Sequence, residues 1–459
     1  MKVVIVGGAG VRTPQIIKTL YSKNAQLQIK EIVLTDIDQK RLYLLKSVND
    51  ELVAGINCQE EIGIKYTTDL KKALVDADFV LFTFRVGQID SRIIDEQIPL
   101  KYGVVGQETT GPGGFAMAMR TIPVMLEYMK IISEVAPTAW VLNLTNPSGL
   151  ITQALLNEGY ERVIGLCDGP SELLNKIAEG LNIPREDLAF EYFGINHLGW
   201  VKRVIHQGSD ITAKVLNIPG IYDNKFLSSD LIKNMGMIPN EYLFFYYQNL
   251  KAVNNLKKSR ISRGQLIQLL NERLFVELEK AQKGESKETP LEIYLRYNQV
   301  RSDSYLKVES VGLETNNIID QLWSGFNTDQ PVEMSTGYGD IALEVMLGIC
   351  GHETRQIILN VKNNGAILDL EKDDCVEVAT FVDRNGVHPI CVSAIPEHAK
   401  GFLQTVKSYE RLTIKAAKEN CYSAALQALT IHPLVPDAIT AQKILDDYIK
   451  EHKTFPELK

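Results

Sequence analysis

The fold is decided by residues 2–14, Lys-Val-Val-Ile-Val-Gly-Gly-Ala-Gly-Val-Arg-Thr-Pro. An apolar, mostly β-branched run ends in glycines, and residues 13–23 show the apolar spacing of an amphipathic helix. Glycines between a strand and a helix let backbone N–H groups approach a pyrophosphate, and the helix N-terminus favours negative charge. Gly7, Gly8 and Gly10 are therefore candidate cofactor-binding residues. Because Thr13 replaces the third glycine of a GxGxxG pattern, a plain tight turn is the alternative.

The same signature recurs along the first part of the chain. Apolar runs that end in polar residues, glycine or proline occupy residues 31–38, 78–84, 139–147 and 162–169, and helix-like segments separate them. Strands buried on both faces that alternate with helices predict a doubly wound parallel sheet of Rossmann type. We assign residues 1–197 to this domain.

From residue 198 the regular alternation of strand-like and helix-like segments ends. Long helical patterns are predicted over Glu241–Asn254, Gly264–Lys283 and Gly337–Gly351, with a helical tail over Glu397–Lys453. A possible antiparallel patch covers residues 377–382 and 389–392. These patterns predict an α+β domain over residues 198–459 that completes the substrate and metal site.

Composition limits the class of protein. The chain has 459 residues, of which 45% are hydrophobic and 23% charged, with a net charge of −8. The apolar fraction excludes a disordered chain, and the charge argues against general nucleic-acid binding. The longest apolar runs fall short of the ~20 residues of a membrane span, and the N-terminus lacks a signal-peptide pattern. Six cysteines without a CxxC pair are typical of reduced thiols, so we expect a cytoplasmic protein without membrane or nucleic-acid partners.

Polar residues stand where the expected strands end, at the sheet edge where ligands bind. Asp36 suits a ribose hydroxyl and favours NAD over NADP, or else it caps the next helix, for which Asp38 is better placed. Arg85 leaves a buried strand beside a glycine and suits an anion clamp, because a guanidinium grips phosphate bidentately. A polar surface loop is the alternative. Asn146 can orient a cofactor or sugar hydroxyl, or serve only as a turn residue before proline.

Cys167 and His197 are a suggestive pair. Cys167 ends an expected strand, and His197 follows thirty residues later. Each alone is typically a structural residue, but together they suit two positions of an open divalent metal site whose other positions take substrate oxygens and water. Tyr242 lies in an aromatic stretch, which is typical of core packing or of a wall on which a sugar stacks. The sequence around Arg263 by itself predicts a surface residue.

Taken in order, these segments resemble the family 4 glycoside hydrolases, the NAD- and divalent-metal-dependent class that departs from the two-carboxylate mechanism. The resemblance extends through nearly the whole chain. It includes GQETTGPGG at 106–114, NLTNPSG at 143–149, FGINHLGW at 193–200, NNGAI at 363–367 and HPLVP at 432–436. IPLKYGV at 98–104 and GFAMAMRTIPV at 114–124 look most like the 6-phospho-β-glucosidase branch. The NAD-binding half and the turn at 145–147 also resemble lactate and malate dehydrogenases.

The resemblance implies redox chemistry inside a hydrolase. NAD removes hydride from C3 of the sugar, the C2 proton becomes acidic, the glycosidic bond leaves by elimination, and water adds before the hydride returns. A divalent metal, expected to be Mn²⁺, is held by the positions matching Cys167 and His197 and polarises the C3 ketone. A tyrosine matching Tyr242 removes the C2 proton.

The resemblance also implies the substrate, most simply a 6-phospho-β-glucoside such as cellobiose 6′-phosphate. Arg85 and Arg263, supported by Arg92 and by the Asn146 amide, match the positions that hold the phosphorylated sugar. Relatives are commonly dimers or tetramers, so a homodimer or homotetramer is expected.

Several positions depart from the family pattern. Gly10 stands where a Ser is usual, YLFFYY at 242–247 replaces YLRYY, and STGYGD at 335–340 replaces a GGAYYSD-like segment. Asp168 matches the acid of the phospho-α-glucosidase branch. A 6-phospho-α-glucosidase, or an enzyme for galactosides or uronides, is therefore an alternative. Outside glycosidases, a 2-hydroxy-acid dehydrogenase or a non-catalytic NAD-binding protein also fits part of the pattern.

Overall fold

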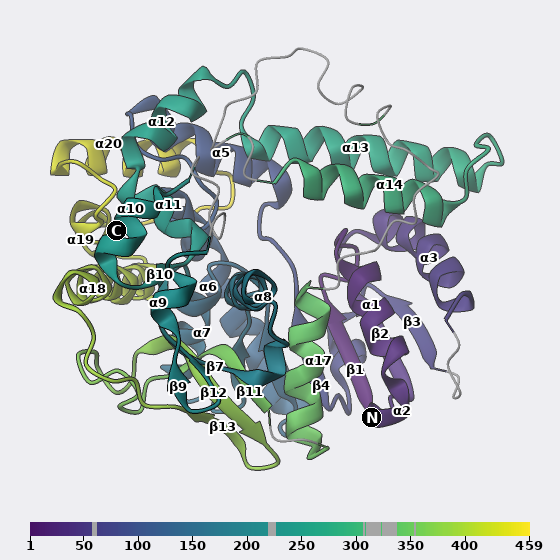
Figure 1. The fold of residues 1–459 in the computed structure, drawn as a ribbon. Coiled ribbons are helices and arrows are strands. Elements are labelled where there is room, and N and C mark those ends of the chain that lie inside the picture. Colours follow the sequence, from purple (N-terminus) through teal and green to yellow (C-terminus); the bar gives the residue numbers. More distant parts are fainter. Residues whose placement is uncertain (57–61, 219–225, 306–307, 309–322, 324–336, 353–354) are drawn as a thin grey trace.

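The computed structural model describes residues 1–56, 62–218, 226–305, 308, 323, 337–352 and 355–459 (Figure 1). Its central sheet consists of β1 (Lys2–Val6), β2 (Glu31–Thr35), β3 (Gly63–Thr67), β4 (Phe79–Phe82), β5 (Trp140–Asn143), β6 (Val163–Gly165), β11 (Arg355–Lys362), β12 (Cys375–Asp383) and β13 (Gly386–Pro389). Among the described residues these form a nine-stranded sheet in the order β13-β12-β11-β6-β5-β4-β1-β2-β3.

The first six strands are parallel, and five of them (β1, β2, β4, β5 and β6) are largely buried, as predicted, whereas the edge strand β3 is partly exposed. Val4 of β1 lies opposite Val33 of β2 and Val80 of β4, and all three side chains are nearly inaccessible to solvent. The order β3-β2-β1-β4-β5-β6 reverses direction between β1 and β4, which places a ligand crevice at the carboxyl ends of these two strands. The prediction of a Rossmann-type α/β fold is confirmed.

Helices connect these strands. They are α1 (Thr13–Ser22), α2 (Asn24–Leu27), α3 (Gln39–Ala54), α4 (Leu70–Leu74), α5 (Gln88–Lys101), α6 (Pro112–Val135), α7 (Ser148–Leu156) and α8 (Gly169–Leu181). The Asp38 carboxylate accepts a hydrogen bond from the Arg41 amide and so caps α3. Asp38, rather than Asp36, is therefore the capping residue.

A second sheet follows the first six strands. It contains β7 (Leu188–Ile195), β8 (Leu198–His206), β9 (Ser209–Asp210) and β10 (Ile238–Pro239), with β8 between β7 and β10. The domain boundary proposed at residue 197 falls in the turn of the β7–β8 hairpin. Asn360 of β11 pairs antiparallel with Gly165 of β6, so β11–β13 extend the first sheet and the two parts of the chain share one core.

The remaining helices come mostly from the second half. They are η1 (Arg185–Asp187), α9 (Thr212–Val215), α10 (Ser229–Met235), η2 (Glu241–Leu243), α11 (Phe244–Tyr247), α12 (Asn249–Lys258), α13 (Arg263–Gln282), α14 (Pro290–Asp303), α17 (Gly337–Cys350), α18 (Glu397–Glu419), α19 (Tyr422–Ile431) and α20 (Ala438–Glu451). In Figure 1, α13 and α14 lie side by side above α1 and α3.

Three expected elements are shorter than predicted. The helix expected over Glu241–Asn254 is divided, because Gln248 leaves the helical region at φ −127°. The tail is three helices, since Asn420 ends α18 in the left-handed region at φ 52° and prolines interrupt the segment after α19. The strand expected at residues 389–392 ends at Pro389.

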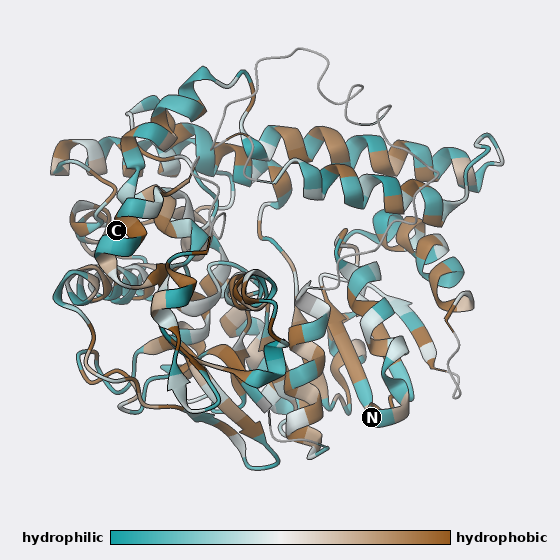
Figure 2. Cartoon of the chain, viewed as in Figure 1, coloured by the Kyte–Doolittle hydropathy of each residue, from teal (hydrophilic) through white to brown (hydrophobic). Residues whose placement is uncertain are grey.

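Apolar residues concentrate on the central strands, whereas α13 and α14 carry hydrophobic and hydrophilic residues in alternation (Figure 2). This is the pattern of helices that cover a core with one face. Among the residues that the structure describes, no helix has both the length and the hydropathy that crossing a bilayer requires.

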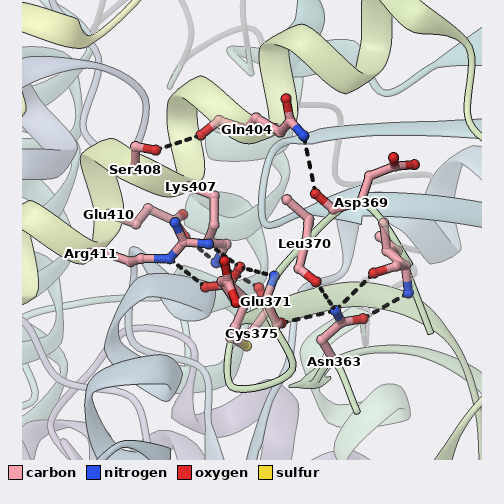
Figure 3. A network of polar contacts seen from close by, with 12 residues as sticks. Asn363, Asp369, Leu370, Glu371, Cys375, Gln404, Lys407, Ser408, Glu410 and Arg411 are labelled. Atoms are coloured by element: carbon pink, nitrogen blue, oxygen red, sulfur yellow. Dashed lines mark hydrogen bonds and ion pairs between the residues drawn. The ribbon is translucent and has the colours of Figure 1, made fainter. Parts of the chain in front are cut away.

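A buried polar network joins α18 to the edge of the central sheet (Figure 3). Lys407 is fully buried, and its Nζ donates to Gln153 Oε1 at 2.7 Å, to the Cys375 carbonyl at 2.6 Å and to Glu410. Arg411 Nε donates to Asp374 Oδ1 at 2.9 Å. A buried ammonium needs such partners to offset its desolvation, so the network specifies how α18 packs rather than serving the site.

The buried His432 leads to a prediction about acid stability. Burial lowers the pKa of His432 to about 3, whereas an unfolded histidine titrates near ~6.5. The stabilisation is complete above that unfolded value and is lost as the pH falls toward the folded value, because only the unfolded chain takes up the proton. The unfolding free energy of the wild type should therefore fall as the pH decreases below ~6.5. We expect this fall to be smaller in His432→Gln, by about 1.4 kcal/mol per pH unit.

Urea unfolding at pH 7, 6 and 5 measures this slope. The matched control is His352→Gln, because the His352 side chain is exposed. Equal slopes in the His432 variant and the wild type would contradict the assignment.

Candidate active site

A cavity of about 820 Å³ lies where the strand order of the sheet reverses. Its lining includes Gly7 and Gly10 after β1, Asp36 after β2, Arg85 after β4 and Asn146 after β5. Residues predicted from separate strand ends therefore share one cavity. Arg92 of α5 lines it as well.

The glycine turn after β1 lets neighbouring backbone, and a ligand in the cavity, approach its main chain closely. Gly7 has φ +95°, and a Cβ there would meet the Phe84 nitrogen at 2.7 Å, so only glycine fits. Gly8 does not line the cavity; a Cβ at this position would meet Leu34 Cβ at 2.8 Å, which shows that Gly8 serves the contact between the turn and β2. The Thr13 hydroxyl, at the first position of α1, is buried and finds no hydrogen-bond partner among the described residues. An unsatisfied donor at a helix N-terminus fits a phosphate.

Asp36 supports this turn from the next strand. Its carboxylate accepts hydrogen bonds from the amides of Ala9 and Asp38, each at 3.0 Å. A carboxylate has about four acceptor sites, so Asp36 retains capacity for a ribose hydroxyl.

Another part of the cavity lining is built around Glu108. Arg92 Nη1 lies 2.9 Å from Glu108 Oε2, Arg85 pairs with the same oxygen, and Arg92 Nε donates to Glu96 Oε1 at 2.8 Å. Burial alone would raise the pKa of Glu108, but Arg92 and Arg85 outweigh it and bring the pKa to about 2. Glu108 is therefore ionised at neutral pH and holds both guanidinium groups in place. The sequence places Glu108 in GQETT but does not reveal this role.

Arg263 is buried, whereas the residue by itself suggested a surface position. It is not part of the cavity lining; its guanidinium donates to the Ser304 carbonyl at 2.9 Å, the Ser304 hydroxyl at 2.7 Å and the Arg301 carbonyl at 3.2 Å. These are the terminal carbonyls of α14, which need such donors. The phosphate role of Arg263 stays a prediction. Arg301 itself lines the cavity together with Arg12, and neither was predicted.

Cys167 and His197 meet, although thirty residues separate them. Cys167 Sγ lies 3.5 Å from His197 Nε2, and both side chains are buried. Gly194 (φ +157°) and His197 itself (φ +125°) occupy backbone conformations that L side chains rarely adopt. Such strain at a non-glycine residue is typical of a functional position.

The donor set fits a divalent ion. A thiolate and an imidazole that hold one ion must lie within about 4 Å of each other, as Cys167 Sγ and His197 Nε2 do at 3.5 Å. Burial lowers the pKa of His197 to about 3, so its imidazole is neutral at pH 7 and able to ligate. Burial and the charges of Glu377 and Asp168 raise the pKa of the Cys167 thiol, so an ion must displace its proton. Among the described residues no third His, Cys, Asp or Glu joins the pair, which leaves positions open.

Tyr242 lies against this pair. Its ring stacks on the His197 imidazole at 3.9 Å between centroids, and its hydroxyl lies 2.9 Å from the Tyr305 hydroxyl. The Tyr305 hydroxyl donates to Glu241 Oε1 at 2.9 Å. Two neighbours of Tyr242, Phe244 and Phe245, are buried, so the aromatic stretch is partly core. Asp168 precedes the first residue of α8 and acts electrostatically on both Cys167 and Tyr305.

A second feature not predicted is the support behind His197. Glu377 of β12 is buried and accepts hydrogen bonds from Tyr192 Oη at 2.8 Å, Asn360 Nδ2 at 3.1 Å and Asn196 Nδ2 at 3.3 Å. Through Asn196 this carboxylate holds the turn that carries His197.

The strand order and the cavity at its reversal define a nucleotide-binding α/β enzyme. The family 4 glycosyl hydrolase profile matches residues 2–183, and the profile of the family's C-terminal domain matches residues 192–435. The chain belongs to family 4 of the glycosyl hydrolases and is a glycosidase. It is 32% identical to a probable 6-phospho-beta-glucosidase of Bacillus subtilis over 99% of this chain and 97% of the relative.

Solved structures agree with this assignment. A 6-phospho-beta glucosidase from Thermotoga maritima, solved with manganese, NAD+ and glucose-6-phosphate, matches with a TM-score of 0.82 and 28% identity over 100% of both chains. A 6-phospho-alpha-glucosidase from gut microorganisms, in complex with NAD and glucose-6-phosphate, matches with a TM-score of 0.82 and 30% identity over 100% of this chain and 99% of its own. A lactate dehydrogenase from a deep-sea metagenome shares only the fold, at 16% identity and a TM-score of 0.52 over 91% of this chain and 98% of its own.

Proposed function

We propose that the protein hydrolyses 6-phospho-glycosides, and 6-phospho-β-glucosides such as cellobiose 6′-phosphate first among them. The observation that carries the proposal is the pair Arg85 and Arg92 on Glu108, in the same cavity as the glycine turn. Two guanidinium groups suit a phosphate dianion, since each offers a planar fork of donors. The names of the B. subtilis and T. maritima relatives support the same substrate class.

NAD and a divalent ion, with Mn²⁺ as first choice, are the proposed cofactors. When bound, NAD supplies reversible hydride acceptance at C3 and the ion supplies Lewis-acid polarisation of the C3 oxygen. Gly7, Gly10, Asp36 and Asn146 would hold the dinucleotide, with Gly8 shaping the turn. Cys167 and His197 would hold the ion. A relative solved with NAD and manganese supports this pair of cofactors.

The proposed proton chemistry uses Tyr242. Its phenolate oxygen, formed when the hydroxyl gives up its own proton, takes the C2 proton of the oxidised sugar, and the glycosidic oxygen departs by elimination. Water then adds at C1, and the C2 proton and the hydride return. The 2.9 Å contact with Tyr305 connects Tyr242 to the Glu241 carboxylate and so offers a path for that proton. Arg85 and Arg263, with Arg92 in the predicted supporting role, orient the sugar through its phosphate.

Asp168 favours a second candidate, 6-phospho-α-glucosidase activity. It lies beside Cys167 and is close enough to act on Tyr305. A carboxyl group there suits protonation of the leaving oxygen. The gut-microbial 6-phospho-alpha-glucosidase supports keeping this candidate. Unphosphorylated galactosides and uronides are further alternatives, and the carboxylate of a uronide suits the same arginines.

Hydrolysis of cellobiose 6′-phosphate beside maltose 6′-phosphate tests the proposal, each with and without NAD and Mn²⁺ under reducing conditions. We expect cleavage of the cellobiose compound that requires both cofactors and leaves no net NADH. Cleavage of the maltose compound that is lost in Asp168→Asn would make the protein an α-enzyme. Net NADH with a 2-hydroxy acid would make it a dehydrogenase, and cleavage of neither disaccharide would contradict the substrate class.

We also propose a cytoplasmic location and a homodimer or homotetramer. Reduced thiols fit the cytoplasm, and in the described part of the chain Cys167, Cys350, Cys375, Cys391 and Cys421 are all free.

A further inference from the structure

Helix α14 is bonded directly to the glycine turn. Tyr294 is fully buried, and its hydroxyl donates to the Val11 carbonyl at 2.7 Å. Gln15 of α1 donates through Nε2 to Asn298 Oδ1 at 2.9 Å. The turn and the start of α1 are therefore held from above by a helix of the second half of the chain (Figure 1).

Arg301 extends from the same helix into the cavity. Its Nη1 donates to the Tyr297 hydroxyl at 2.7 Å, and that hydroxyl donates to Asn271 Oδ1 of α13 at 2.7 Å. Arg263 bonds to the carbonyl of Arg301 and so holds the end of α14. Arg301 is thereby held at its carbonyl and at one guanidinium nitrogen while its side chain lines the cavity.

Arg12 approaches the same space from the turn itself. Arg12 and Arg301 both act electrostatically on Tyr294, which bonds to the turn, and both line the cavity. The buried, unpaired Thr13 hydroxyl lies next along the chain. Two guanidinium groups and a free hydroxyl at a helix N-terminus make a built anion site.

We propose that Arg301 and Arg12 clamp the diphosphate of the bound dinucleotide, with the Thr13 hydroxyl as a third donor. This inference rests on the proposed NAD cofactor and adds a residue from the second half of the chain to its site. The sugar phosphate is the competing anion, because Arg12 and Arg301 also act electrostatically on Glu108. Arg85 and Arg92 pair with Glu108 directly, however, whereas α14 is bonded to the glycine turn.

Isothermal titration of the metal-free protein with NAD, ADP, adenosine and glucose 6-phosphate tests the clamp. We expect Arg301→Gln to weaken NAD and ADP roughly 10- to 100-fold, as for loss of a charged hydrogen bond, and to leave adenosine unchanged. Arg12→Gln should show the same selectivity from a residue outside α14, which excludes a folding defect of that helix. The matched control is Arg273→Gln, whose exposed side chain pairs with Glu277 and does not line the cavity.

The results of these titrations distinguish failure of the clamp from failure of the proposed function. Wild-type protein that binds neither NAD nor ADP would overturn the cofactor and the clamp together. Unchanged ADP affinity in Arg301→Gln, with tight binding by the wild type, would overturn the clamp alone. An equal loss of affinity for ADP and adenosine would also overturn the clamp. A loss of affinity confined to glucose 6-phosphate would overturn it as well.

Discussion

Replacing His197 with alanine is expected to lower metal-dependent turnover at least ~1000-fold, which corresponds to about 4 kcal/mol of transition-state stabilisation. His197 Nε2 and Cys167 Sγ lie 3.5 Å apart, and in the described residues no further His, Cys, Asp or Glu joins them. A site with two protein ligands has none to spare, so Cys167→Ser should have a similar effect.

The measurement combines Mn²⁺ titration with turnover of cellobiose 6′-phosphate. We expect both variants to lose Mn²⁺ affinity and to keep the unfolding midpoint of the metal-free wild type within a few degrees. Cys421→Ser is the control, because Cys421 is a free cysteine outside the site. Turnover near the wild-type level in either variant would refute the metal assignment.

Replacing Tyr242 with phenylalanine is expected to slow exchange of the C2 proton by ~100- to 10,000-fold, the range typical of losing a general base. Phenylalanine keeps the ring that stacks on His197 at 3.9 Å and removes only the hydroxyl that contacts Tyr305. The effect should therefore fall on the chemical step rather than on metal affinity or the fold.

Incorporation of solvent deuterium at C2 during turnover reports this step directly. Tyr246→Phe, a change of the same kind four residues along the chain, should exchange at the wild-type rate. Undiminished exchange in Tyr242→Phe would identify another base, and a parallel loss of Mn²⁺ affinity would show that the hydroxyl supports the metal site instead.

Some elements of the sheet were easier to predict than others. β1, β2, β4, β5 and β6 are continuous apolar runs because helices cover both faces of a parallel sheet. β3 lies at the sheet edge, where its residues are partly exposed, so it carries no comparable signal and was not predicted. The division of the helices after residue 240 depends on single backbone conformations such as that of Gln248, which periodicity does not report.

The family and the Rossmann-type sheet follow from the sequence alone, and so do the residues at the strand ends, because parallel topology gathers those ends at one edge whatever the loops do. Gly7, Asp36, Arg85 and Asn146 share a cavity for this reason. Which long side chains reach that cavity depends instead on tertiary packing. Arg263 bonds to the end of α14 and Arg301 lines the cavity instead, because the path of a flexible arginine is set by neighbours far away in the sequence.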